Sequence, residues 1–221
     1  MNEKITTPFL NVYYVLDPMC SWCWAFRDSW LALLKELPEE VNIRYVLGGL
    51  AADSDTPMAD SMRQGLQQTW AMIAERTGTE FNFDFWSNNT PRRSTYPACR
   101  AVISAARLKP GSLLDMVHAI QRAYYMQAKN PSDTTILCDC AESIGIDRKS
   151  FAEELESEVV EQDFQKNLYL AQTMGIQGFP AVLVVAQKND NEKPAHHLIT
   201  SGYCDAQTLV ENWHRQISLA V

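Results

Sequence analysis

The 221-residue sequence lacks the features of a secreted or membrane-anchored protein. Residues 1–8 contain no basic segment that leads into an apolar run, and the apolar stretch that follows is short and contains Asn11. We therefore expect no signal peptide, no transmembrane helix and a cytoplasmic location. The six cysteines should then be mostly reduced, as is usual in a reducing compartment.

The sequence also has fewer basic than acidic residues. The 19 Lys and Arg residues against 27 Asp and Glu residues give a formal net charge of −8, which argues against nucleic acid as the main partner. No apolar segment is long enough to span a bilayer, so we expect no membrane partner either. The hydrophobic content of 46% and the charged content of 21% are typical of a globular protein.

The stretch with the clearest chemistry is residues 17–24, Asp-Pro-Met-Cys-Ser-Trp-Cys-Trp. Residues 9–16 before it are aromatic and β-branched, which predicts a buried strand. After it, apolar residues recur at helical spacing up to Pro38. Cys20 and Cys23 therefore lie where a strand ends and a helix begins.

Cys20 and Cys23 are three positions apart, so on a first helical turn they share a face and their sulfurs can come within disulfide range. The free N–H groups and dipole of that turn stabilise a thiolate, and such sites lower a cysteine pKa from ~8.5 to roughly 3.5–7.5. Cys20 is then the attacking thiol, and Cys23 resolves the mixed disulfide. Two structural cysteines, or half of a zinc site, are the alternatives for a single C-x-x-C.

The rest of the chain alternates between strand and helix patterns. Residues 41–47 read as a second strand that runs parallel to the first and stops at Gly48-Gly49. From 51 to about 174 the pattern is helical, with an aromatic-rich loop at 81–91. The first four expected helices start at Thr56–Pro57, Pro97, Ser112 and Ser132 and end at Gly78, Pro110, Ala128 and Gly145, respectively. Asp147 then opens a short helix, and a longer helix follows it and reaches Gly175.

Strand patterns return near the end of the chain. Residues 179–186 predict a strand entered through a proline, residues 187–194 a polar turn, and residues 197–200 a partner strand. Asp205 can cap a last helix over 206–219. The fold class is therefore α/β, with a discontinuous domain of residues 1–51 and 175–221 and an inserted helical domain of residues 52–174.

Three features together resemble the thioredoxin fold: the C-x-x-C pair on the first helix, the loop 175–180 (Gly-Ile-Gln-Gly-Phe-Pro) and the terminal hairpin with its helix. The inserted helices make the chain similar to the DsbA-like family. The string at 17–24 resembles the leaderless, cytoplasmic branch of predicted protein-disulfide isomerases, near the FrnE-type oxidoreductases. The resemblance covers nearly the whole chain, and it implies a thioredoxin fold with a large all-helical insertion.

The same resemblance implies a thiol–disulfide oxidoreductase or isomerase whose partners are protein or small-molecule thiols and disulfides. It implies that the Phe179–Pro180 bond is cis, that Pro180 packs beside Cys20, and that the Phe179 backbone pairs with an extended substrate. Trp22 is a further candidate for substrate binding. A trans proline at the entrance of a strand is the alternative.

The alternative enzyme function is a glutathione-dependent transferase or isomerase, like glutathione transferase kappa and the chromene-carboxylate isomerases, which the chain also resembles. In them a helix similar to the one at 94–100 helps to form the substrate pocket, which makes Cys99 a candidate; a small buried core residue is the alternative. An aspartate near the position of Asp205 contacts the γ-glutamyl group there. Glutathione would then be a substrate, and we expect no other cofactor. Those relatives usually lack the second cysteine, so Cys23 favours dithiol chemistry.

Thioredoxin and DsbA carry an acidic residue six positions before the first cysteine, where this chain has Tyr14. The usual carboxylate for deprotonating the resolving cysteine is therefore missing. Asp17 lies closer, and we interpret it as a structural helix cap.

Other candidate residues suggest structural roles. Cys138 and Cys140 are two apart on a predicted helix, so they point to different sides, one into the core and one partly exposed. Cys204 follows the last hairpin without a predicted role. No metal site is expected, although a metal- or partner-binding module remains the non-enzyme alternative. Surface or packing roles are expected for His118, His196, His197 and His214, and core or lid roles for Phe81, Phe83, Phe85 and Trp86.

Overall fold

The computed structural model describes residues 9–187 and 194–220. They include a mixed sheet with the strand order β2-β1-β3-β4. Strand β1 (Phe9–Leu16) pairs in parallel with β2 (Asn42–Leu47) and antiparallel with β3 (Ala181–Gln187). Strand β4 (Ala195–Ser201) lies antiparallel to β3. The predicted strands and pairings are therefore present, while most of the predicted turn between β3 and β4 lies outside the described residues.

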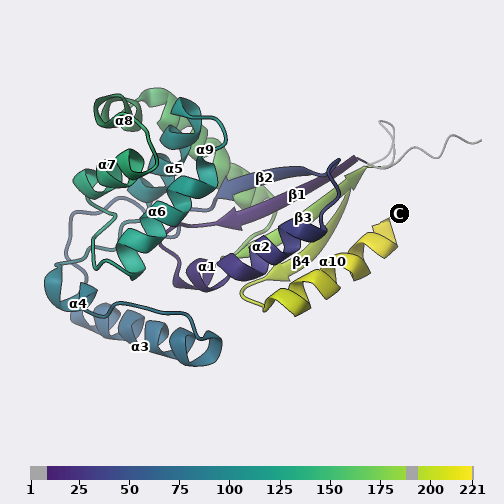
Figure 1. The fold of residues 1–221 in the computed structure, drawn as a ribbon, viewed down its shortest axis with the longest axis horizontal. Helices are drawn as coiled ribbons and strands as arrows, with labels where there is room; N and C mark the ends of the chain where they lie inside the picture. Colours follow the sequence, from purple (N-terminus) through teal and green to yellow (C-terminus); the bar gives the residue numbers. More distant parts are fainter. Residues whose placement is uncertain (1–8, 188–193, 221) are drawn as a thin grey trace, which may run out of the picture.

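Helices cover both faces of this sheet (Figure 1). The first helix is broken at Phe26 into α1 (Ser21–Ala25) and α2 (Arg27–Glu36). Helix α2 packs against α10 (Ala206–Ala220), which also contacts β4. Helix α9 (Glu158–Thr173) packs against β2 on the opposite face. This layering follows from the strands, in which alternate apolar side chains point to opposite faces.

Helix α5 forms the centre of the helical layer and contacts α6, α7, α8 and α9. Its buried face is built mostly from alanines and other small residues, so neighbouring helices can approach closely. The bounds of the helices in this layer are α3 (Asp60–Thr77), α4 (Phe85–Asn88), α5 (Tyr96–Leu108), α6 (Leu113–Tyr125), α7 (Thr134–Ser143) and α8 (Arg148–Leu155).

Helix α3 lies at the edge of the molecule, beside α1 (Figure 1). The buried ring of Trp70 fixes it there, because it packs against aromatic rings of the following loop and of α6, namely Phe81, Phe85, Trp86, Tyr124 and Tyr125. Phe85 and Trp86 are buried, whereas Phe83 is 42% exposed. The aromatic-rich segment is thus largely core, and α4 interrupts what was expected to be a loop.

Two predicted helix starts are wrong because a residue expected at each start makes a tertiary contact instead. Helix α3 begins at Asp60 rather than at Pro57, and Pro57 instead forms a β-bridge with Arg92. Helix α7 begins after Asp133, and the hydroxyl of Ser132 donates to the Ser94 carbonyl at 2.7 Å.

Two other caps are confirmed. Asp147 accepts a hydrogen bond from the Ser150 N–H at 2.9 Å, and Asp205 accepts one from the Thr208 N–H at 2.8 Å. Each carboxylate satisfies an N–H group at a helix start that has no partner within its helix.

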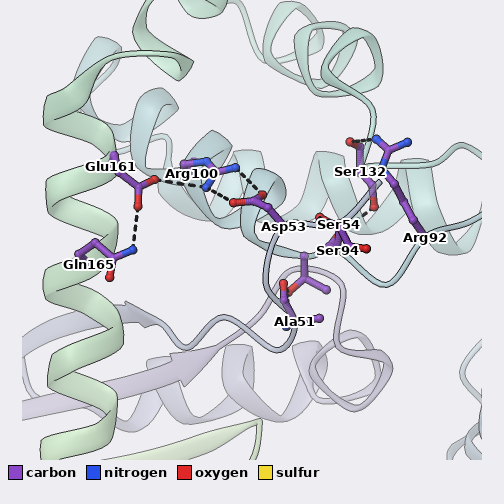
Figure 2. A network of polar contacts seen from close by, with 10 residues as sticks. Ala51, Asp53, Ser54, Arg92, Ser94, Arg100, Ser132, Glu161 and Gln165 are labelled. Atoms are coloured by element: carbon purple, nitrogen blue, oxygen red, sulfur yellow. Dashed lines mark hydrogen bonds and ion pairs between the residues drawn. The ribbon is translucent and has the colours of Figure 1, made fainter. Parts of the chain in front are cut away.

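Polar contacts attach the segment after β2 to the helical layer (Figure 2). The Arg100 guanidinium donates to both carboxylate oxygens of Asp53, at 2.8 and 2.7 Å, and to Glu161 at 3.2 Å. The Ala51 N–H donates to the Thr95 hydroxyl at 3.0 Å. The loop is therefore tied to α5 and α9 at several points.

The apolar core runs continuously from the sheet into the helical layer, since one cluster of buried residues contains both Val184 of β3 and Ile120 of α6. The proposed division into two domains stays a prediction. In the described part of the chain, no helix combines the length and apolar character needed to cross a bilayer.

We predict that Gly49→Ala destabilises the fold more than Gly78→Ala. Both glycines have positive φ, of 61° and 71°, so an alanine costs about 1 kcal/mol at either position. A Cβ at Gly49 would also lie 2.6 Å from Leu168 and 2.7 Å from Tyr96, whereas nothing lies within 4 Å at Gly78. Overpacking should add about 1–3 kcal/mol at Gly49, measurable by urea unfolding. Equal losses would mean that the packing around Gly49 is looser than described.

Candidate active site

The buried carboxylate of Asp17 joins three segments of the chain. Its Oδ1 accepts the Met19 N–H at 2.7 Å, and its Oδ2 accepts the Leu50 N–H and the Thr95 hydroxyl, both at 2.6 Å. These donors come from the turn before α1, the loop after β2 and the residue before α5. Asp17 is therefore not the helix cap that we expected, because Cys20 is the N-cap of α1 and the carboxylate holds tertiary structure instead.

Cys99 lies on the first turn of α5 and is completely buried. Its thiol donates to Oδ2 of Asp17 at 3.6 Å. Burial and the charge of Asp17 raise the pKa of Cys99 well above its usual value. Cys99 thus supports Asp17 in this structure and has no surface to offer a substrate.

The environments of Cys20 and Cys23 differ. Cys20 is 7% exposed and Cys23 only 1%, so Cys20 is the less deeply buried residue of the pair. Hydrogen bonds from the Cys23 thiol and from the N–H groups of Cys23 and Trp22 lower the pKa of Cys20, against the opposing effects of burial and the charge of Asp17. Burial, followed by the interaction with Cys20, raises the pKa of Cys23 well above its usual value.

The loop before β3 lies next to Cys20. The Phe179–Pro180 peptide bond is cis, and the Cys20 thiol donates to the Phe179 carbonyl at 3.6 Å. The ring of Phe179 occupies the space beside Gly48, where any Cβ would collide with the ring. Gly48 therefore permits the close approach that places this backbone beside the sulfur.

Tyr14 stands six positions before Cys20, where thioredoxin and DsbA have an acidic residue. It is buried, and the centroid of its ring lies 4.6 Å from that of Trp30. Burial, the charges of Cys23 and Cys20 and a hydrogen bond with Cys23 raise the pKa of Tyr14 well above its usual value. The phenol therefore keeps its proton at neutral pH, where it can stabilise a thiolate but cannot act as a base.

Two further predicted site residues lie on the same side of the molecule. Trp22 is half-buried and its ring is 5.5 Å from that of Tyr203. Asp205 is exposed, and it lines a cavity of about 540 Å³ together with Trp24, Arg27 and Tyr203. Tyr203 thus contacts Trp22 and also lines this cavity.

The remaining cysteines lie elsewhere. Cys138 and Cys140 are both buried, each only 5% exposed, so the expectation that one of them is partly exposed is wrong. Helix α7 packs against both α6 and α8, which buries more than one of its sides. Burial raises the pKa of Cys140 to about 11. Within residues 9–187 and 194–220, no group of three or more His, Cys, Asp or Glu side chains is arranged to hold a metal ion.

The sequence did not point to Thr95, Leu50 or Gly48 as parts of the site. Thr95 is 78 positions from Asp17, and Leu50 contributes only its backbone N–H. No local pattern reports such long-range contacts. The Ser94–Arg100 motif was the nearest signal, because it marks the start of the helix that carries Cys99.

A family model for thioredoxin matches residues 13–207. The chain belongs to the thioredoxin family. The match includes Cys20, Cys23 and Pro180, and the helices inserted between β2 and β3 give a DsbA-like form of the fold. The family and the fold support thiol–disulfide oxidoreductase chemistry at a general level.

Two solved structures are similar over nearly the whole chain. A candidate protein disulfide isomerase from Nitrosomonas europaea is 27% identical, with a TM-score of 0.83 over 96% of this chain and 100% of that one. The cytosolic disulfide reductase DsbM from Pseudomonas aeruginosa, in a structure with GSH, is 21% identical, with a TM-score of 0.73 over 96% and 100% of the two chains.

Among curated proteins, the ClpXP adapter protein SpxH from Halalkalibacterium halodurans is 23% identical over 187 residues, which cover 83% of this chain and 61% of that protein. SpxH from Bacillus subtilis is also 23% identical and covers similar shares. The chain therefore spans about 60% of the length of these relatives.

We predict that Asp17→Asn lowers the pKa of Cys20, because the buried negative charge of Asp17 raises it. The rate of Cys20 alkylation against pH, followed by mass spectrometry, measures the midpoint. Asp205→Asn is the matched control, because asparagine also caps a helix and Asp205 is not among the main causes of the shift in the pKa of Cys20. An unchanged or higher midpoint in Asp17→Asn would show that Asp17 acts through structure alone.

Proposed function

We propose that the protein is a thiol–disulfide oxidoreductase in which Cys20 is the nucleophile and Cys23 the resolving thiol. The observation that carries the proposal is the position of the C-x-x-C pair at the start of α1, where the Cys20 thiol lies 3.6 Å from the Phe179 carbonyl. The opposite directions of the two pKa shifts support it. A lowered pKa on the more exposed sulfur and a raised pKa on the buried one favour attack by Cys20 and storage of a proton on Cys23.

The reaction proceeds in two exchange steps. The Cys20 thiolate attacks one sulfur of a substrate disulfide, an S–S bond forms to Cys20, and the other substrate sulfur leaves as a thiolate and takes up a proton. Cys23 then loses its proton and attacks Cys20, which forms the Cys20–Cys23 disulfide and releases the second substrate thiol. The substrate gains two electrons and two protons, which the protein dithiol loses.

The backbone at Phe179 and Pro180 lies where an extended substrate would meet Cys20. A substrate segment that pairs with this backbone brings its disulfide to the sulfur. The name of the Nitrosomonas europaea structure supports protein disulfides as substrates, and the DsbM structure with GSH supports glutathione as a thiol partner. The "cytosolic" description of DsbM supports the proposed cytoplasmic location.

The curated relatives favour a second candidate, a protein-binding adapter, because they are named as ClpXP adapters. In that case binding would not need the dithiol. A glutathione-dependent transferase or isomerase is the remaining enzyme alternative, and it would need Cys20 but not Cys23.

We predict that Cys23→Ser accumulates mixed disulfides on Cys20, while Cys20→Ser accumulates none. Loss of the resolving thiol blocks the second step and leaves the first intact. Adducts from cell extract, separated without reductant and identified by mass spectrometry, measure this.

The identity of the adduct separates the candidates. Protein adducts on Cys23→Ser support the proposed function, and glutathione as the sole adduct on an otherwise active Cys23→Ser supports the glutathione-dependent enzyme. Equal trapping by both variants would contradict the assignment of the nucleophile. Absence of adducts from both, with a partner still bound, would favour the adapter.

A further inference from the structure

The surface beside the dithiol carries a cation at its rim. Arg76 is exposed in the last turn of α3. Its guanidinium carbon lies over two rings, 5.7 Å from the centroid of Trp22 and 5.9 Å from that of Tyr203. Trp22 belongs to the short helix α1 that Cys20 begins, and α1 packs against α3, so Arg76 is held beside the turn that carries the dithiol.

The N–H groups of Arg76 have no acceptor within the part of the chain that the structure describes, since no hydrogen bond or ion pair there involves this side chain. By contrast, Arg92 pairs with Asp133, and Arg100 pairs with Asp53. A guanidinium placed over aromatic rings is held in position while its N–H groups remain available for a carboxylate.

Asp205 and Arg76 both lie near Tyr203, but the Asp205 carboxylate does not form an ion pair with Arg76. Burial and Asp205 raise the pKa of Tyr203 and Arg76 lowers it, so both charges act on this ring from nearby. The Asp205 carboxylate accepts the N–H of Thr208 at the start of α10, and no ion pair joins it to Arg76.

The negative net charge of the chain bears on the role of Arg76 in binding an anionic substrate. At −8, the protein as a whole repels anionic molecules. A preference for a carboxylate-bearing substrate therefore needs a positive group at the point of contact, and Arg76 is suitably placed.

We propose that Arg76 is a specificity residue that binds a substrate carboxylate close to the disulfide under attack by Cys20. The substrate class is a disulfide with a carboxylate within about one residue of the half-cystine. Glutathione disulfide and an acidic peptide disulfide share this chemistry. The inference rests on the proposed function, because Arg76 would orient the same disulfide whose reduction oxidises Cys20 and Cys23.

The test compares matched disulfides on the reduced full chain. One pair is glutathione disulfide and its fully methyl-esterified form. The other is a peptide disulfide with Asp next to the half-cystine and its Asn counterpart. The second-order rate of protein oxidation is measured for the unchanged protein, Arg76→Gln, Arg76→Lys and the control Arg215→Gln, which removes an exposed arginine from α10.

We expect the unchanged protein and Arg215→Gln to react about fivefold faster with the carboxylate member of at least one pair, which corresponds to about 1 kcal/mol. Arg76→Gln should lose this ratio and keep its rate with the uncharged member, and Arg76→Lys should keep part of the ratio. Discrimination within the glutathione pair alone identifies glutathione as the source of the carboxylate, and discrimination within the peptide pair alone identifies an acidic peptide.

Two results would overturn the inference while leaving the proposed function intact. One is an Arg76→Gln variant that slows both members of each pair equally, because Arg76 would then act by packing Trp22. The other is an unchanged protein that oxidises readily but does not discriminate. An unchanged protein that reacts with none of the four disulfides would instead refute the proposed function.

Discussion

The structure around the dithiol depends on one buried charge, the carboxylate of Asp17. A buried carboxylate is costly unless donors surround it, and here they come from Met19, Leu50, Thr95 and Cys99. Those donors belong to segments far apart in the chain. Satisfying one carboxylate therefore fixes the turn before Cys20 relative to the loop after β2 and to the start of α5. The helical insertion is in this way connected directly to the active-site turn.

The same charge also acts on the chemistry. Asp17 raises the pKa of both Cys20 and Cys23, but Cys20 receives hydrogen bonds that overcome this effect, and Cys23 does not. The two sulfurs are thus separated in acidity by their hydrogen-bond donors and their depth, not by a neighbouring cation. In the proposed reaction, the first exchange step is favoured at Cys20, whereas the second needs a proton to leave a buried thiol next to Tyr14, a phenol that stays protonated.

Much of the fold could be predicted from local patterns. β1 has the bounds that its aromatic and β-branched residues indicated, and Asp147 and Asp205 cap helices because their donors lie three residues ahead. The failures share one cause, which is contact between distant segments. Ser132 has the composition of a cap, but its hydroxyl bonds to Ser94, and Asp17 likewise bonds to Leu50 and Thr95. The cysteine pair was identified from the sequence, but the opposite shifts of the pKa values of Cys20 and Cys23 also depend on how deeply each residue is buried.

A shared fold does not settle the activity, since the similar proteins include a disulfide reductase and ClpXP adapters. The part of the molecule that can distinguish between partners is the surface around the small exposed area of Cys20. The residues described near Cys20 include Phe179, whose backbone carbonyl accepts the Cys20 thiol, and Trp22, which packs against Tyr203. Under the proposed function, a partner would meet these residues where it reaches Cys20. Partner choice would then depend on these side chains near the surface, whereas the buried core fixes the positions of Cys20 and Cys23.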